Sequence, residues 1–162
     1  LMNNDIEIPE NMKHWLHRLV QLCKPSNVAA TAPVSNYVMG IQDVRHNATI
    51  IGSDCFAKFL IPFTTLYKKE VLDKIGLFDT KFQLDNGFSG DADLDISMRI
   101  TEAGYLMVIA RDVFVYHHGS ESLSKATGSF DNCIEANKVT RQMLVDKWGK
   151  TKVDELFKVQ LV

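Results

Sequence analysis

Apolar residues recur at two spacings along the chain, and each spacing predicts a different kind of element. Residues three or four apart share one face of a helix, whereas alternating or continuous apolar residues are typical of strands. Helical spacing predicts helices over residues 10–23, 68–75, 90–103, 131–148 and 151–157. Apolar runs predict strands over residues 28–31, 59–67, 105–110 and 113–116, and a hairpin built from 36–42 and 48–51. Interleaved helices and strands favour an α/β domain, with a mixed sheet and flanking helices.

Glycines mark the expected ends of several helices. Gly76, Gly104 and Gly149 follow helical patterns at the position where glycine commonly ends a helix. A turn at Arg111-Asp112 is expected to separate the last two strands. The helix over 90–103 carries apolar residues on two stripes, so we expect it to be packed on both sides.

The composition adds that this is an ordinary globular chain. Its 162 residues fit one domain by the usual prior of about 100–200 residues. Hydrophobic residues make up 46% and charged residues 23%. Eighteen basic against 20 acidic residues give a net charge of −2, which argues against a nucleic-acid partner. The apolar run 105–110 is far shorter than the roughly 20 residues of a transmembrane helix, so no such segment is expected.

The three cysteines, Cys23, Cys55 and Cys133, lie far apart and form no C-x-x-C pair. An odd, scattered set favours reduced thiols over a disulfide framework or a zinc site. The first residues also lack the basic and apolar regions of a signal peptide. We therefore expect a cytoplasmic protein, and leave open whether it lies against a membrane surface.

The first candidate for chemistry is Asn3-Asn4-Asp5, which follows a presumed strand at Leu1-Met2. Asn3 and Asp5 are spaced as side chains on one face of a strand, and open α/β sheets bind ligands at the carboxyl ends of strands. A carboxylate there is a candidate ligand for Mg²⁺ or Mn²⁺, because hard cations prefer oxygen. The alternative is an ordinary turn, which these residue types also favour.

The second candidate is a run of three aspartates, Asp91, Asp93 and Asp95, at the expected start of a helix. Asp91 is a natural N-cap, and Asp93 lies in the first turn, where the helix dipole favours the ionised form. An ionised, partly buried carboxylate can act as a general base. Asp95 and Arg99 are four residues apart, which predicts an ion pair. The alternative is capping and salt bridging alone.

The third candidate is the pair His117-His118, directly after the predicted strand 113–116. A histidine at a strand end is a candidate metal ligand, and the alternative is a surface histidine. Together with the first two candidates, this pair completes a set that contains metal ligands and a base.

The order of these motifs resembles the second half of a glycosyltransferase family 2 domain, which has the GT-A fold. Residues 66–79 are similar to the family's apolar strand, basic pair, short helix and Gly-x-Phe-Asp motif. Residues 92–100 resemble its Glu-Asp-x-Asp-Leu-x-x-Arg helix, and residues 115–120 resemble its late histidine motif. Residues 147–149 resemble a Lys-Trp-Gly after the last helix, and residues 3–5 fit the position of an Asp-x-Asp-like metal motif.

The resemblance implies transfer of a sugar from a nucleotide-diphosphate sugar to a glycan or other hydroxyl acceptor, most often with inversion, as in polysaccharide biosynthesis. It implies that Asp5 and His117 hold Mn²⁺ or Mg²⁺ on the diphosphate, with His118 as the less favoured ligand. Asp93 would take the proton from the acceptor hydroxyl. The residues expected to contact substrate or to position the base are Asn3, Asp91 and Asp95.

The sequence departs from the family pattern in two ways. Ala92 stands where a glutamate is common, which leaves Asp93 in place. The nucleotide-binding first half of the family has no counterpart here. We therefore expect one domain over 1–162, the acceptor- and metal-side part of a GT-A domain, with a core over 1–128 and C-terminal helices over 129–162. An edge strand exposed by this absence would favour self-association.

Two other classes of function stay open. One is a non-catalytic module derived from a glycosyltransferase, which would bind a glycan or a protein; the absent first half favours it. The other is a metal-dependent enzyme of phosphoryl or nucleotidyl transfer, which would use the same aspartate and histidine residues.

Overall fold

The chain forms a mixed sheet with flanking helices, as its interleaved pattern predicts. The computed structural model describes residues 1–45, 54–85, 90–119 and 130–158. The strands are β1 (Ile6–Glu7), β2 (Val28–Ser35), β3 (Cys55–Ala57), β4 (Leu66–Tyr67) and β5 (Leu106–His117). The helices are α1 (Trp15–Leu22), α2 (Lys69–Ile75), α3 (Ala92–Glu102), α5 (Phe130–Trp148) and α6 (Lys150–Lys158). Short 3₁₀ turns lie at η1 (Glu10–Met12), η2 (Gly40–Gln42) and η4 (Thr80–Phe82).

Two long strands, β2 and β5, run parallel at the centre of the sheet. The strand order is β1-β5-β2-β4, and β4 pairs antiparallel to β2. Because β2 occupies one edge of β5, β1 and β3 share the other edge, and both pair antiparallel to β5. β3 pairs with the first half of β5 and β1 pairs with its last two residues. The parallel β2 and β5 therefore end at the same edge of the sheet, where open sheets of this kind bind ligands.

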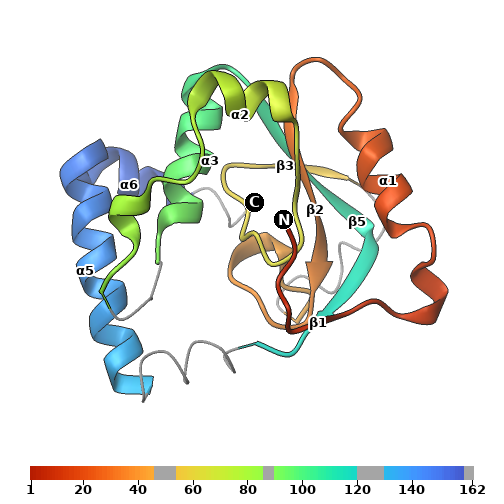
Figure 1. Cartoon of the computed structure of the whole chain (residues 1–162), viewed down its shortest axis with the longest axis horizontal. Helices are drawn as coiled ribbons and strands as arrows, with labels where there is room; N and C mark the ends of the chain where they lie inside the picture. Colours follow the sequence, from red (N-terminus) through yellow and green to blue (C-terminus); the bar gives the residue numbers. More distant parts are fainter. Residues whose placement is uncertain (46–53, 86–89, 120–129, 159–162) are drawn as a thin grey trace.

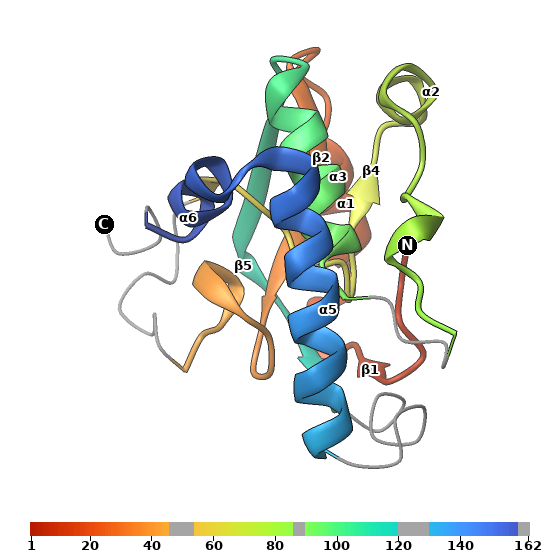
Figure 2. The ribbon, with the colours of Figure 1, turned by 90° about the vertical axis from the view of Figure 1, so that its left-hand side faces the viewer.

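Helices cover both faces of the sheet (Figure 1). On one face, Leu19 of α1 packs against Ala110 and Val113 of β5. On the other face, Val71 of α2 and Ile96 of α3 pack against β2 and β5. Figure 1 shows α5 and α6 on the far side of α3 from α1, so the molecule is layered as α1, sheet, α2 with α3, and α5 with α6; Figure 2 views it from the side of α5.

The prediction that the helix over 90–103 is packed on both sides is confirmed. Ile96 and Ile100 of α3 belong to the core against the sheet. Leu94 and Met98 belong to a second core with Leu144 of α5 and two residues of α6. α3 therefore joins the sheet to the C-terminal helices, and its first turn is fixed from both sides.

The expected turn at Arg111-Asp112 is wrong, because β5 is one continuous strand. The register between β2 and β5 jumps from Pro33 opposite Ala110 to Val34 opposite Phe114. The three intervening residues are absorbed as a bulge, which keeps the pairing with β2 on both sides of it. The polar pair at 111–112 thus marks an irregularity inside a strand and not a turn between two.

Several other boundaries also differ from the sequence predictions. The helix predicted over 10–23 is a 3₁₀ turn followed by α1, and the strand predicted over 36–42 is a bend followed by η2. Only the last two residues of 59–67 form a strand, although residues 63–65 pair through their backbone with residues 1–3. The expected hairpin strand 48–51 lies outside the described residues.

The glycine signals are confirmed. Gly76, Gly104 and Gly149 have φ of 88°, 82° and 82°, and each follows the last residues of α2, α3 or α5. A positive φ is accessible to glycine without the clash that a Cβ would cause. Cys23 and Cys55 are free thiols, and the side chain of Cys133 is not among those described. No helix in the described ranges is long and apolar enough to cross a membrane.

Candidate functional site

Asp5 and His117 meet at the edge of the sheet where β5 ends. Pairing of β1 with β5 sets Ile6 opposite His117, and the amide of His118 donates to the carbonyl of Asp5 at 2.9 Å. As a result, Nε2 of His117 lies 3.3 Å from Oδ1 of Asp5. His118 makes a separate, exposed pair with Glu7. The strand register therefore sets His117, and not His118, facing Asp5. His117 is also the ligand that the sequence resemblance favours.

The ring of His117 is held in one orientation by the segment that follows β2. Nδ1 lies 2.6 Å from the carbonyl oxygen of Tyr37, and the amide of His117 donates to Oδ1 of Asn36 at 2.9 Å. Phe63 stacks on the imidazole, with ring centroids 5.4 Å apart. A carbonyl can only accept, so Nδ1 carries a proton, and Nε2 is the ring nitrogen that faces Asp5. Metal-binding histidines are commonly fixed in this way.

The pair formed by Asp5 and His117 fits a small divalent cation. Oδ1 of Asp5 is buried and has no hydrogen-bond partner among the described residues. A positive charge between these two atoms, either a proton on Nε2 or a bound cation, stabilises the pair. Ligands at right angles around an ion bound at about 2.1 Å lie about 3 Å apart, close to the observed 3.3 Å. In the described ranges no third His, Cys, Asp or Glu completes a cluster, so phosphate oxygens and water would fill the remaining positions.

Asn3 lies beside this pair along the chain. Its amide donates to the carbonyl of Phe63 at 2.8 Å, and the residue is exposed. The presumed strand at Leu1-Met2 is thus a short antiparallel pairing with residues 63–65 rather than a member of the parallel sheet. This pairing brings Phe63 against His117 while Asn3 stays open to a ligand.

Asp93 lies in the wall of an open hollow of about 690 Å³. The hollow is lined from four parts of the chain, including Met39, Ile61, Asp91, Asp93, Lys138 and Arg141. Oδ1 of Asp93 accepts from the amide of Leu94 at 2.9 Å. The pKa of the Asp93 carboxyl is raised to about 6, mainly by burial and in part by the charge of Asp91, while the amide of Leu94 and the charge of Arg141 oppose the rise. Such a carboxylate is ionised at neutral pH and is a stronger base than an exposed aspartate.

A buried phenol completes the surroundings of Asp93. Oη of Tyr67 is buried and has no hydrogen-bond partner among the described residues. Burial raises the pKa of Tyr67, and the negative charge of Asp93 adds to the rise. Tyr67 therefore keeps its proton at neutral pH and lies close enough to Asp93 for the charge of that carboxylate to act on it.

Asp91 stands at the N-cap position of α3, but its side chain does not cap the helix. Its φ is 55°, and it is the one non-glycine residue with positive φ in the described part of the chain. Both carboxylate oxygens accept from Arg141 of α5, at 2.8 and 2.9 Å. The expected capping role is therefore replaced by an ion pair with a residue 50 positions later.

Asp95 is fully buried and occupied by other side chains. The expected pair with Arg99 is present at 3.0 Å, and Oδ1 accepts from the indole of Trp148 at 2.8 Å. Lys147 also approaches the same carboxylate at 2.9 Å. With both oxygens engaged, Asp95 fixes α5 on α3, and we do not carry it forward as a substrate contact.

Two short segments connect the Asp5–His117 pair to the hollow beside Asp93. Tyr37 holds His117 while Met39 lines the hollow, and Phe63 stacks on His117 while Ile61 lines the hollow. Two residues span at most about 7 Å, so the pair and the hollow are neighbours. The candidate metal ligands therefore lie close to the hollow that Asp93 lines.

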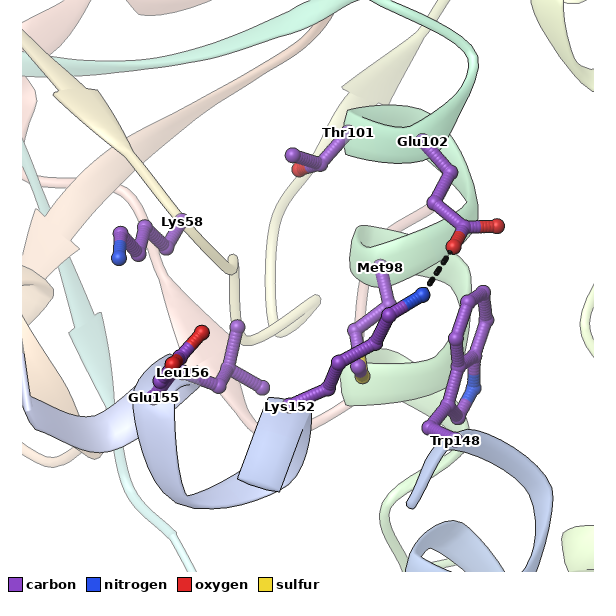
Figure 3. Close-up of a pocket in the computed structure, with 8 residues that line it drawn as sticks. All are labelled: Lys58, Met98, Thr101, Glu102, Trp148, Lys152, Glu155 and Leu156. Atoms are coloured by element: carbon purple, nitrogen blue, oxygen red, sulfur yellow. Dashed lines mark hydrogen bonds and ion pairs between the residues drawn. The ribbon is translucent and has the colours of Figure 1, made fainter. Parts of the chain in front are cut away.

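A second, smaller pocket of about 250 Å³ lies between α3 and α6 (Figure 3). Met98, Trp148 and Leu156 give it apolar walls, and the ion pair between Lys152 and Glu102 crosses its rim. None of the predicted site residues lines this pocket. It therefore plays no part in the candidate site.

Several residues of the site are not identified from the sequence, among them Tyr37, Phe63 and Arg141. Tyr37 acts through its backbone carbonyl, which no side-chain pattern reveals. Phe63 stands in an apolar run that is typical of core. Arg141 is one of many charged residues on a long helix, and its pairing with Asp91 depends on how α5 packs on α3.

Comparison with models of known families, with curated proteins and with solved structures gives no match for this chain. The resemblance to glycosyltransferase family 2 therefore rests on the order of the motifs. The site described above has to be interpreted from its own chemistry.

Proposed function

We propose that this chain carries the metal- and acceptor-side residues of a glycosyltransferase that moves a sugar from a nucleotide-diphosphate sugar to an acceptor hydroxyl. The proposal rests on two neighbouring features. One is an Asp–His pair suited to a divalent cation, and the other is a hollow lined by a candidate base. The motif order supports the same reaction class. The Asp–His pair lies at the end of β5, and strand ends are the usual place for ligands in such sheets.

Asp5 and His117 would hold Mn²⁺ or Mg²⁺, which supplies positive charge for the leaving diphosphate. Each side chain is mostly shielded from water, with 15% and 13% of its surface exposed, so neither needs to move to bind an ion. Asn3, exposed at the same edge, is placed to hydrogen-bond the donor.

Asp93 would take the proton of the acceptor hydroxyl as its oxygen attacks the anomeric carbon. The bond from that carbon to the diphosphate oxygen then breaks, and a single displacement inverts the configuration. A raised pKa suits this task, because general-base efficiency is highest when the pKa is near the working pH.

The test is a transfer assay on the complete gene product that contains residues 1–162. Donors would be UDP-, GDP- and dTDP-sugars with Mn²⁺, tested against a panel of glycan acceptors. Asp93→Asn should lower transfer at least about 100-fold, the usual contribution of a general base, while donor binding stays. The matched control is Asp73→Asn, which removes an exposed carboxylate of α2 and should leave transfer unchanged.

Transfer at the wild-type rate in Asp93→Asn would overturn the assignment of the base. Binding of a glycan or protein without any transfer would favour the non-catalytic module. Release of phosphate or pyrophosphate without sugar transfer would favour phosphoryl or nucleotidyl chemistry on the same residues.

A further inference from the structure

The guanidinium of Arg141 in α5 binds the carboxylate of Asp91, the N-cap residue of α3. Nε and Nη2 of Arg141 donate to the two oxygens of Asp91 at 2.8 and 2.9 Å. This two-bond geometry is the strongest form of a carboxylate ion pair and fixes direction as well as distance. Only 6% of the Asp91 side chain is exposed, so the pair is largely shielded from solvent on that side.

The backbone of Asp91 adopts an unfavourable conformation that this ion pair can stabilise. Its φ of 55° lies in the left-handed region, which side chains with a Cβ adopt at a cost in free energy. The left-handed turn directs the chain into α3, and the first intrahelical bond runs from the amide of Asp95 to the carbonyl of Asp91 at 2.9 Å. Asp93 is the second residue of that helix, so its position follows from this turn.

Arg141 is itself held in place by the C-terminal helices. Its guanidinium lies 4.6 Å from the ring centroid of Phe157 in α6, a stacking that limits where the fork can point. The α5–α6 pair thus supports a contact at the wall of the hollow. A lysine at this position would keep the charge but lose both the fork and the stacking.

The charges near Asp93 come from three elements. Asp91 adds a negative charge from the start of α3, and Arg141 and Lys138 add positive charge from α5. Tyr67 of β4 is neutral, and Lys138 is paired with Glu135. Arg141 is therefore the cation that cancels the charge of Asp91, two residues from the candidate base.

We propose that Arg141 is a positioning residue: it holds Asp91 in the left-handed turn that begins α3 and thereby keeps Asp93 in place and ionised in the wall of the hollow. The proposal rests on the proposed function for its catalytic meaning. The electrostatic coupling itself does not depend on which reaction the site performs. It can therefore be tested without a substrate.

The experiment is an NMR titration of the Asp93 carboxyl carbon in the complete gene product. In Arg141→Gln, the charge of Asp91 loses its partner, and the pKa of Asp93 should rise by about one pH unit. In the double variant Asp91→Asn/Arg141→Gln, both charges are gone and the pKa should return close to the wild-type value. Lys138→Gln is the matched control, because it removes the other cation of the hollow and should leave the pKa nearly unchanged.

An unchanged Asp93 pKa in a folded Arg141→Gln variant would overturn the proposal. If that variant does not fold, Asp91→Asn alone serves instead: the pKa of Asp93 should fall, and an unchanged value would again overturn it. Arg141→Lys should restore the pKa but not the rate, because it keeps the charge without the fork. These titrations stand even if no glycosyl transfer is found, so the two proposals fail separately.

Discussion

Single residues at this site have surroundings that a purely structural residue would avoid. Asp5 keeps a buried oxygen without a hydrogen bond, and Asp93 is a carboxyl group whose pKa is raised to about 6 by burial. Asp91 adopts a left-handed backbone. Unfavourable local arrangements tend to gather at functional sites, where the surrounding structure maintains them. Here they gather at one edge of one sheet.

The raised pKa of Asp93 predicts a pH-dependent effect on stability. Because the folded-state pKa exceeds the ordinary value of 3.8, the proton binds more tightly to the folded chain, and stability falls as pH rises from about 4 through 6. Asp93→Asn imitates the neutral acid. It should raise the free energy of unfolding by about 1–3 kcal/mol at pH 7 and change it little at pH 4.

Thermal unfolding at the two pH values measures this effect. Asp73→Asn should leave the melting temperature nearly unchanged at both, because its carboxylate is mostly exposed. A loss of stability in Asp93→Asn that is equal at pH 4 and pH 7 would contradict the buried, pH-sensitive environment described for Asp93.

At the level of residues, the sequence identifies those whose partners are local. The pair of Asp95 with Arg99 follows from their spacing on a helix, and it is confirmed. The burial of Asp95 by Lys147 and Trp148 depends on residues about 50 positions away, so no local pattern reveals it. Arg141 escapes prediction for the same physical reason.

The ends of helices and strands can be predicted from the sequence where neighbouring residues determine them. Gly76, Gly104 and Gly149 supply the positive φ that ends each of three helices, so these ends were predictable. β5 was predicted as two strands because a polar pair interrupts it at 111–112. The pairing with β2, which is long-range, carries the strand through this bulge. Periodicity alone also failed at 36–42, a segment too short to separate a strand from a bend and a 3₁₀ turn.

The packing of α5 on α3 predicts a large effect from one apolar residue. Leu144 is fully buried against Leu94 and Met98, whereas Val139 on the same helix is 50% exposed. Leu144→Ala should lower the free energy of unfolding by about 2–5 kcal/mol, because it removes packed atoms and leaves a cavity. Val139→Ala should change it by less than about 0.5 kcal/mol.

Urea denaturation followed by circular dichroism would measure both variants. Equal, small effects of the two substitutions would mean that α5 does not pack on α3 as described. The position of Asp91 and Asp93 would then lack its support from the C-terminal helices.

In the whole molecule, a well-packed sheet and its helices lie next to an open hollow. Helices cover both faces of β2 and β5, and the second core fixes α3 from behind. The first turn of α3 lines the hollow, and the segments that follow β2 and precede β4 connect the hollow to the Asp5–His117 pair. The α/β class was predictable from interleaved patterns, whereas the GT-A relation, the single-domain boundary and self-association stay predictions.

The central claim is that Asp5 and His117 hold a divalent cation, and Mn²⁺ titration followed by electron paramagnetic resonance tests it most directly. The chain offers a matched control, because the exposed pair of His118 with Glu7 lies one residue further along β5. His117→Ala should weaken Mn²⁺ binding at least about 10-fold, and His118→Ala should leave it unchanged, with both variants folded. Equal Mn²⁺ binding by wild type and His117→Ala, or none by either, would contradict the account.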